Sequence, residues 1–293
     1  MRIINLVLIL LFATSTQLQA QEKVLFFQTD WGNQLPLEAF CERAKASGYD
    51  GIEVWFPTDP DKRKTLLGTL ERLGLKVIFL HGTNKSLPFK ESLEHYKKGL
   101  ETALGQGPVL VNCHTGSDFF TFEENMAFIE AANTISAQYG IPVYHETHRG
   151  RFTYSLPITN TYLSRIPDLK LTLDISHWMV VHESLLEGKE ELLAPVITRS
   201  HHIHARIGHP EGPQVNDPKA PEWKKALDRH LEIWESIIKK GWKEHNGVFT
   251  VTTEFGPPDY MPTLPYTGMP LSDQWQSNVH MMEAIKERLK LKD

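Results

Sequence analysis

The sequence predicts a single (β/α)8 barrel, the TIM-barrel class, on three observations. Short runs of β-branched and apolar residues alternate with longer amphipathic runs along the chain after residue 20. Strand-like runs such as Lys76-Val-Ile-Phe-Leu80 are apolar on both faces, as expected of a parallel sheet that helices cover. Eight strand–helix units in a chain of 293 residues fit a closed barrel. A doubly wound open sheet is the alternative, but no Gly-x-Gly-x-x-Gly sequence follows the first strand.

The predicted elements follow one another as strand and helix, eight times. The strands are expected at Val24–Trp31, Gly51–Phe56, Lys76–His81, Pro108–Thr115, Ile141–Thr147, Leu169–Ser176, His201–Ile207 and Phe249–Phe255. The helices are expected at Leu35–Ser47, Asp61–Leu73, Phe89–Leu104, Phe122–Tyr139, Ile158–Arg165, Ser184–Thr198, Glu222–Lys240 and Ser272–Leu289. Glycines follow several of the helical runs, and glycine readily adopts the left-handed conformation that often ends a helix. They are Gly48, Gly74, Gly105, Gly140 and Gly241.

Residues 1–20 are predicted to be a signal peptide, which leaves 21–293 as one catalytic barrel domain. Arg2 is followed by an almost unbroken apolar run from Ile3 to Ala13, and a short polar stretch then ends at Ala20. The apolar run is shorter than the roughly 20 residues that span a bilayer, and an uncleaved N-terminal anchor is the alternative. We therefore expect a periplasmic or secreted protein with no membrane contact after cleavage.

The composition limits the partners and the redox chemistry. The formal net charge is −5, and an acidic protein gains little from the counterion release that drives binding to nucleic acid. Cys41 and Cys113 fall on a predicted helix and a predicted strand, where buried free thiols are expected. The sequence has no Cys-x-x-Cys for a thiolate metal site. We expect a small-molecule substrate and no nucleic acid, and a homo-oligomer is left open.

Ionisable residues gather at the carboxyl ends of the predicted strands, where barrels of this class carry their active sites. Asp174 and Glu254 stand inside apolar strands, and a charge there costs several kcal/mol unless it is paired or bound to a cation. Converging carboxylates repel one another, and a divalent ion removes that repulsion. The expected metal ligands are Glu146, Asp174, His204 and Glu254. This set suits Mn²⁺, Mg²⁺, Co²⁺ and Zn²⁺ without selecting one of them, and we expect Mn²⁺ first.

A second interpretation of the same carboxylates needs no metal. Glu146, Asp174 and Glu254 could form a structural ion-pair network. The available cations are Arg149, Arg151 and Arg206.

The strand-end motifs resemble those of the xylose-isomerase-like barrel superfamily, and within it the sugar isomerases and epimerases of the tagatose and psicose epimerase type. The motifs are Gly51-Ile-Glu-Val-Trp, Glu146 on the fifth strand, Asp174-x-x-His177, His204-x-Arg206 and Glu254, and they cover the whole barrel. The resemblance implies that the Glu, Asp, His and Glu bind a divalent metal and that His177 and Arg206 contact substrate. It also implies proton abstraction beside a carbonyl, with Glu146 and Glu254 as the catalytic carboxylates.

Further strand-end residues are expected to contact substrate, namely Glu53, His81, His114 and His148. Each has a plainer alternative, since a strand-end histidine can serve only to hydrogen-bond a loop, and Glu53 can be buried and paired to a neighbour. His145 and His148 have opposite strand parity, so one should face the helices, and we expect His148 at the mouth. His201 and His202 begin the seventh strand at the opposite end and are left out of the site.

The predicted function is a metal-dependent isomerase or epimerase acting on an unphosphorylated sugar or keto-sugar. A lyase or hydrolase acting on a keto-glycoside is the alternative, because the same metal and base serve when a substituent leaves. A zinc AP endonuclease of the same superfamily is disfavoured, because its Asp-x-His sequence is replaced here by Asp217-Pro-Lys219. A sugar-binding barrel without activity would need no metal.

Overall fold

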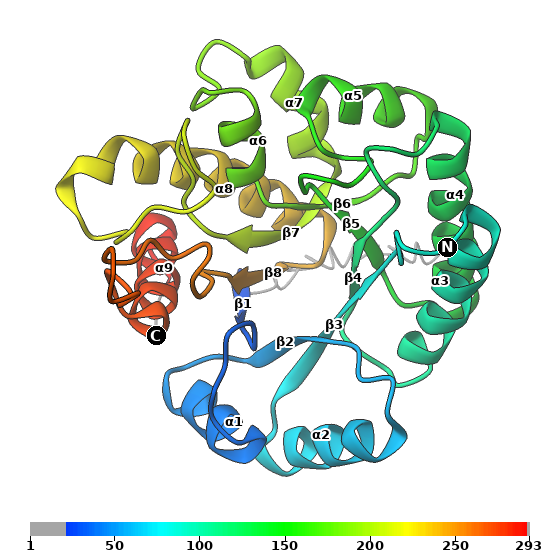
Figure 1. Cartoon of the computed structure of the whole chain (residues 1–293), viewed down its shortest axis with the longest axis horizontal. Helices are drawn as coiled ribbons and strands as arrows, with labels where there is room; N and C mark the ends of the chain where they lie inside the picture. The colour runs from blue at the N-terminus through cyan, green and yellow to red at the C-terminus, as the bar shows by residue number, and fades with distance from the viewer. Residues whose placement is uncertain (1–21, 292–293) are drawn as a thin grey trace, which may run out of the picture.

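The chain forms a closed barrel of parallel strands surrounded by helices (Figure 1). The computed structural model describes residues 22–291, so the predicted signal peptide lies outside the described residues. The strands follow one another around the barrel in sequence order, and β1 pairs with β8 to close it. The predicted fold class is thereby confirmed. Within residues 22–291, no helix is both long and apolar enough to cross a membrane.

Strands and helices alternate around the barrel. The strands are β1 Lys23–Thr29, β2 Gly51–Trp55, β3 Lys76–Gly82, β4 Val111–His114, β5 Val143–Glu146, β6 Leu171–Leu173, β7 Ser200–Ala205 and β8 Val248–Thr253. The helices are α1 Leu37–Ala46, α2 Pro60–Leu73, α3 Phe89–Leu104, α4 Phe122–Tyr139, α5 Leu156–Arg165, α6 Ser176–Val181, α7 Glu190–Arg199, α8 Lys224–Glu244 and α9 Gln274–Leu289, with a 3-10 turn η1 at Pro221–Trp223.

The predicted elements are present, with differences at their ends and one additional helix, α6. Helices α3 and α4 begin and end at the predicted residues. Gly105 is right-handed, and Gly241 lies inside α8 and does not end it, so these two predictions are wrong. A Cβ on Gly241 would lie 2.2 Å from the Phe249 ring, so the glycine lets α8 approach β8 closely. The sequence does not predict α6, because its apolar residues directly follow the sixth strand.

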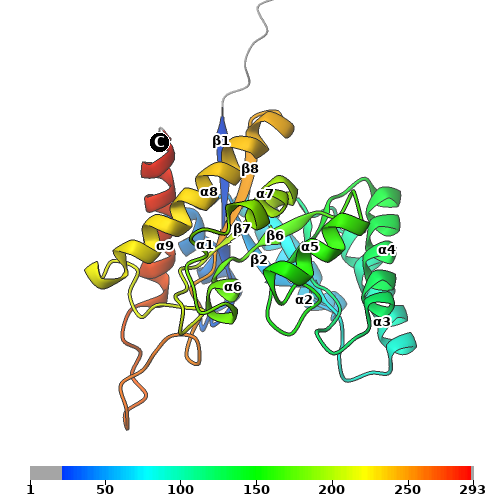
Figure 2. The ribbon, with the colours of Figure 1, turned by 90° about the horizontal axis from the view of Figure 1, so that it is seen from above.

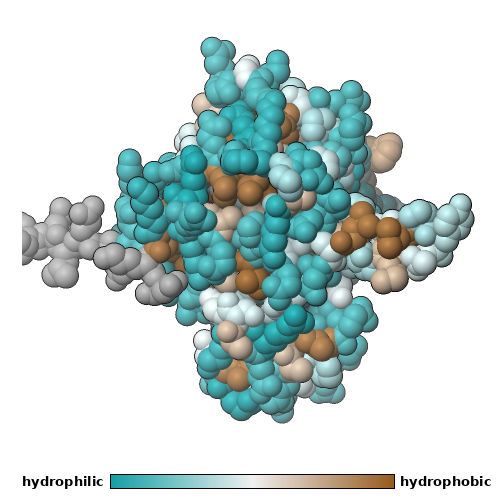
Figure 3. Space-filling view, turned by 90° about the vertical axis from the view of Figure 1, so that its left-hand side faces the viewer, coloured by the Kyte–Doolittle hydropathy of each residue, from teal (hydrophilic) through white to brown (hydrophobic). Residues whose placement is uncertain are grey.

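The carboxyl ends of the strands carry a long loop after β8, which covers residues 254–273. This loop projects from the end of the barrel opposite to the one where β1 begins (Figure 2). Its outer part exposes Leu264, Met269 and Leu271. The space-filling view shows hydrophobic residues on a projecting lobe and in several smaller patches of a mostly hydrophilic face (Figure 3). The inner part of the loop returns to the barrel, where Met261 is 2% exposed.

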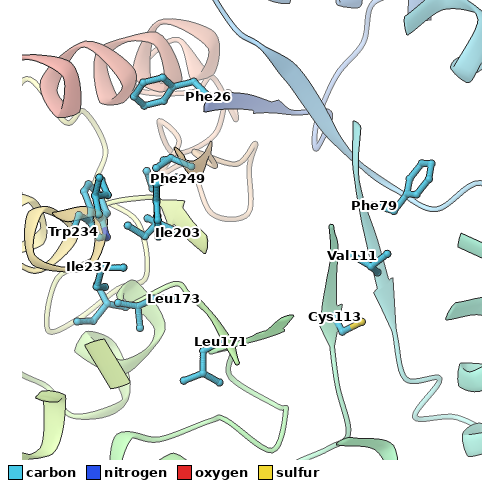
Figure 4. Close-up of a cluster of buried hydrophobic side chains, with 14 of the residues drawn as sticks. Phe26, Phe79, Val111, Cys113, Leu171, Leu173, Ile203, Trp234, Ile237 and Phe249 are labelled. Atoms are coloured by element: carbon cyan, nitrogen blue, oxygen red, sulfur yellow. The ribbon is translucent and has the colours of Figure 1, made fainter. Parts of the chain in front are cut away.

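Apolar side chains fill two layers. Between strands and helices, residues such as Ile203 and Phe249 lie beside Trp234 and Ile237 of α8 (Figure 4). Inside the barrel, a smaller cluster lies toward the amino ends of the strands and consists of Leu25, Phe27, Ile78, Leu110 and Tyr144. Both cysteines are buried and free, as predicted. The inner cluster closes one end of the barrel and leaves the other for polar groups.

Candidate active site

Strand pleating decides which of the predicted residues face the inside of the barrel. On β7, His202 and His204 face inward, while Ile203 and Ala205 lie in the outer apolar core. Arg206 continues the inward series and is 2% exposed. Polar side chains of the other strands meet these residues above the inner apolar cluster, which places the candidate site at the carboxyl end of the barrel.

Three of the predicted metal ligands converge there. Glu146, His204 and Glu254 each offer one donor atom, and these atoms lie within 4.8 Å of one another. His204 Nδ1 is 3.0 Å from Glu254 Oε2 and 3.5 Å from Glu146 Oε2. Burial lowers the pKa of His204, but the charges of Glu254, Glu53 and Glu146 outweigh it and hold that pKa well above its usual value. The three-residue cluster therefore attracts one positive charge.

The same three-residue cluster contains incompletely satisfied atoms. Among residues 22–291, Glu146 Oε1 is buried without a hydrogen-bond partner, and His204 Nδ1 and Glu254 Oε2 face each other at 3.0 Å but lack hydrogen-bond geometry. A buried polar atom without a partner costs about 1–3 kcal/mol, so the free oxygen beside this pair indicates room for a ligand. Carboxylate oxygens and an imidazole nitrogen are donors that Mn²⁺, Mg²⁺, Co²⁺ and Zn²⁺ accept. The residues present thus fit a divalent metal, which would take the place of the proton on His204.

Glu53 lies beneath His204 and does not line the mouth, which corrects its predicted role as a substrate contact. Its Oε1 is 2.9 Å from His204 Nε2, and its Oε2 is 3.4 Å from His202 Nε2. Burial raises the pKa of Glu53, but His204 and His202 outweigh it, so that pKa lies far below its usual value. The ionised carboxylate holds Nε2 of His204 and leaves Nδ1 facing the mouth.

Two residues of this buried layer are missed by sequence reasoning. His202 belongs to it, and its Nδ1 is 2.8 Å from the Thr250 hydroxyl. Asn112 on β4 donates to Glu146 Oε2 at 2.8 Å and to Glu53 Oε1 at 3.1 Å, and so links the two carboxylates. The sequence does carry a signal for Asn112, because it is an amide inside an apolar strand. A buried amide needs a hydrogen-bond partner, as a buried charge does.

Asp174 stands apart from the three-residue cluster. Its Oδ1 accepts hydrogen bonds from the backbone and hydroxyl of Ser176, and its Oδ2 forms an ion pair with Arg206. Burial raises the pKa of Asp174 to about 6, although Arg206 acts in the opposite direction. The structure therefore does not bring the four predicted ligands into one group. Asp174 instead forms an ion pair with Arg206, as in the interpretation without a metal. Asp174 and His177 do form a second group of potential ligands with Glu146.

Three histidines predicted to bind substrate surround the cluster. His114 Nε2 is 2.9 Å from Glu146 Oε2. The His148 ring lies 4.6 Å from the His114 ring and 4.0 Å from the His177 ring. Burial lowers the pKa of His148 and of His177 well below the usual value, so both are neutral at pH 7. Arg149, which the sequence suggests only as a counter-ion, donates to His177 at 3.0 Å.

An active-site pocket of about 110 Å³ opens above the cluster. The residues around it are Trp31, Trp55, Leu80, His114, Glu146, His148, Arg206, Glu254 and Tyr260. Tyr260 comes from the long loop after β8, and its ring lies 4.8 Å from the Arg206 guanidinium and 4.8 Å from the Trp31 ring. The sequence gives no signal for Tyr260, because an irregular loop has no periodicity from which its direction can be read.

His81 lies outside this pocket, which corrects its predicted role. It follows Leu80, which lines the pocket, so strand pleating turns the His81 ring toward α3. Its Nε2 is 2.9 Å from the Tyr96 carbonyl, and a Cβ on Gly99 would lie 2.5 Å from its ring. His145 also faces away from the pocket, with Nδ1 2.7 Å from the Thr115 hydroxyl, whereas His148 lines the pocket as expected.

The fold and the site can be compared with known proteins. Residues 41–244 match the sequence model of the xylose isomerase-like TIM barrel family. The protein belongs to this family. The resemblance inferred from the strand-end motifs is thereby confirmed. No curated protein matches the chain.

Solved structures share the fold of this xylose isomerase-like barrel at low identity. A 3-keto-D-glucoside 4-epimerase from E. coli has a TM-score of 0.61 and 14% identity, over 90% of this chain and 100% of its own. A xylose isomerase-like TIM barrel protein from Mycobacterium smegmatis, in complex with magnesium, has a TM-score of 0.60 and 11% identity, over 90% and 97%. A probable 3-DHS dehydratase from Bacillus anthracis has a TM-score of 0.56 and 14% identity, over 90% and 99%. These likenesses show the fold alone.

Proposed function

We propose that the protein is a metal-dependent epimerase or isomerase that moves a proton at the carbon next to the carbonyl of an unphosphorylated keto-sugar. The observation that carries this proposal is the pair of buried carboxylates, Glu146 and Glu254, beside His204 at the floor of a pocket. A reaction that removes and returns a proton at one carbon needs two groups that accept protons, or one that does both. Glu146 and Glu254 are positioned for those roles.

The lining of the pocket supports a neutral sugar as substrate. Trp31, Trp55 and Tyr260 offer aromatic rings to the C–H groups of a sugar. Arg206 is the one fixed cation among the described residues around the pocket, and it is already paired with Asp174. A phosphate is best bound by cations with free donors. The pocket therefore favours a sugar without phosphate.

The two carboxylates have different surroundings, which suggests different tasks. Glu146 accepts hydrogen bonds from Asn112 and lies 2.9 Å from His114. Burial raises the pKa of Glu146, but the charges of His114 and His204 outweigh it and keep the carboxylate ionised. Glu254 lies nearer the outside, beside His204 at 3.0 Å and Arg206 at 3.6 Å. Glu146 is thus a fixed base, and Glu254 is the partner on the solvent side.

Glu146, His204 and Glu254 would hold the divalent metal, with Glu53 and Asn112 keeping them in place from below. The chemistry that a metal supplies in such a site is polarisation of the substrate carbonyl, which acidifies the neighbouring C–H. The bound magnesium of the M. smegmatis structure and the activity named for the E. coli epimerase support metal and sugar chemistry on this fold.

Solvent deuterium exchange tests this proposal. The purified protein is incubated with Mn²⁺ in D₂O with aldoses, ketoses and 3-keto-glycosides, and the products are followed by NMR. We expect deuterium at the carbon next to the carbonyl without release of a substituent. Release of an aglycone or of water in place of a deuterated isomer would show the alternative lyase. Absence of exchange on every compound would contradict the proposal.

Matched carboxylate variants serve as the control. Glu254→Gln should abolish exchange, because it removes a proton acceptor from the pocket. Glu187→Gln should leave exchange unchanged, because Glu187 is an exposed carboxylate paired with Lys225. Equal activity of the two variants would remove Glu254 from the mechanism.

A further inference from the structure

A second cavity adjoins the active-site pocket at Trp55. This side cavity has a volume of about 570 Å³ and lies between α1, α2 and the loops after β1 and β2. Trp55 lines both the side cavity and the active-site pocket, and it is 49% exposed. Its ring lies edge-on to His114, with the ring centres 5.2 Å apart. One indole ring therefore stands between the two spaces.

The sizes of the two spaces indicate that a ligand would use both. Small-molecule sites have volumes of about 300–1,000 Å³. The active-site pocket, at about 110 Å³, is well below that range, whereas the side cavity lies within it. A ligand larger than the reacting sugar must extend beyond the pocket, and the side cavity provides adjoining room.

The side cavity also carries a carboxylate that no cation neutralises. Asp30, Asp61 and Lys62 line it. Asp61 and Lys62 are exposed to solvent, whereas Asp30 is partly buried and forms no salt bridge within residues 22–291. Asp30 is half-buried, and burial together with the charge of Glu53 raises its pKa to about 6. A half-buried carboxylate with no neighbouring cation is stabilised when a ligand supplies further donors.

A second cavity of the same volume lies on the other side of residues 30–36, and its polar side chains already have partners within the protein. It meets the active-site pocket at Trp31. Its polar side chains are engaged within the protein: Gln274 donates to the carbonyls of Trp31 and Phe255, and Arg43 stacks on Trp275 at 4.0 Å. The side cavity is therefore better suited to bind a hydroxylated ligand.

We propose that the side cavity binds a second sugar unit, so that the protein acts on glycosides in preference to free monosaccharides. The inference rests on the proposed function, because the second sugar is the unit attached to the sugar that reacts in the active-site pocket. The indole ring of Trp55 packs against C–H groups at the junction of the two sugars. The Asp30 carboxylate accepts hydrogen bonds from hydroxyls of the second sugar.

Binding measurements test this inference independently of turnover. Isothermal titration and saturation-transfer NMR compare glucose with cellobiose and maltose on the wild-type protein loaded with Mn²⁺. We expect one disaccharide to bind at least about tenfold more tightly than glucose, which corresponds to one good charge-assisted hydrogen bond. Asp30→Ala, which lies outside the active-site pocket, should remove that advantage and leave glucose affinity unchanged.

Two aromatic truncations provide a matched control. Trp55→Ala should weaken disaccharide binding, whereas Phe119→Ala should not, because Phe119 is 91% exposed and lines neither space. Equal affinity of the wild type for glucose and both disaccharides, or no binding of any, overturns the inference, as does an equal loss for both sugars in Asp30→Ala.

The two proposals fail in distinguishable ways. Deuterium exchange on a keto-monosaccharide, without tighter binding of a disaccharide, removes the second sugar site and leaves the proposed function standing. Disaccharide binding that depends on Asp30, without exchange on any keto-sugar, contradicts the proposed function and leaves the binding site standing.

Discussion

Glu53 Oε1 lies 2.9 Å from His204 Nε2, at the base of the candidate metal site. The contact holds His204 in one orientation, in which its other ring nitrogen, Nδ1, is 3.0 Å from Glu254. Histidines that bind metals almost always donate their second ring N–H to a carboxylate or carbonyl, which sets the tautomer and the ring direction. Glu53 thus positions His204 and does not itself meet the substrate.

Replacing Glu53 should weaken metal binding although Glu53 does not line the active-site pocket. Glu53→Gln keeps the shape but removes the charge that faces His204 Nε2, and we expect Mn²⁺ affinity to fall by about 10–100-fold. Isothermal titration of the metal-free protein with Mn²⁺ measures the change. Glu187→Gln, an exposed carboxylate, is the control. Unchanged affinity in a folded Glu53→Gln protein would show that other contacts orient His204.

Removing Arg206 should destabilise the protein strongly. Arg206 is 2% exposed and pairs with the fully buried Asp174, so Arg206→Met leaves a buried carboxylate without its cation. Breaking a buried pair in this way costs about 3–5 kcal/mol. Lys225→Met is the control, because the exposed pair of Lys225 with Glu187 contributes at most about 1 kcal/mol. Urea unfolding followed by circular dichroism gives both values, and similar losses would contradict a structural role for the Arg206–Asp174 pair.

His230 should make the fold sensitive to acid. It accepts a hydrogen bond from the Gly208 backbone N–H at 3.1 Å and donates to the Ala226 carbonyl, so it must be neutral. Burial lowers its pKa from 6.5 to about 4, and the folded state therefore takes up the proton less readily than the unfolded chain. The stability linked to His230 is complete above pH 6.5 and is lost as the pH falls toward 4, by about 3 kcal/mol.

His230→Gln isolates this effect, because glutamine does not titrate. The difference in the free energy of unfolding between the wild type and the variant should shrink by about 3 kcal/mol from pH 7 to pH 4. Urea unfolding at several pH values measures it. A difference that stays constant over this range would show that His230 titrates alike in the folded and unfolded states.

Tyr260 should contribute to substrate binding through its ring. The ring lies 4.8 Å from the Arg206 guanidinium and covers one side of the pocket. Tyr260→Ala removes the ring and should raise KM about tenfold, in line with a desolvated cation–π contact and the loss of a sugar-facing surface. Tyr260→Phe keeps the ring and should retain nearly the wild-type KM. Steady-state kinetics on the substrate found by deuterium exchange checks both, and equal KM values for the two variants would rule out a role for the ring.

The barrel and the centre of the site could be predicted from the sequence because both depend on periodicity. Apolar strand runs predict a parallel sheet, and the carboxyl ends of parallel strands meet at one mouth. This brings Glu146, His204 and Glu254 together although more than one hundred residues separate the first from the last. Because Leu80 faces the pocket, strand alternation turns the next residue, His81, toward the helices.

The remaining parts of the site depend on contacts that no periodicity encodes. Whether Asp174 pairs with Arg206 depends on the register between β6 and β7. The sequence does not reveal this register, because the two strands pair with a shift between Leu171 and Thr172. Tyr260 reaches Arg206 from an irregular loop. The sequence does not single out Asn112 because an amide carries no charge, although buried amides need partners as charges do.

Diffraction from crystals soaked in Mn²⁺, measured at the manganese absorption edge, tests whether Glu146, His204 and Glu254 bind one metal ion. We expect one anomalous peak within about 2.5 Å of a Glu146 oxygen, His204 Nδ1 and a Glu254 oxygen, the distance range of oxygen and nitrogen ligands to such cations. The same map would show whether Asp174 leaves Arg206 to join them. No peak at these three residues, or a peak only at His201, Glu244 and His245 on the opposite end of the barrel, would show that they do not form the metal site.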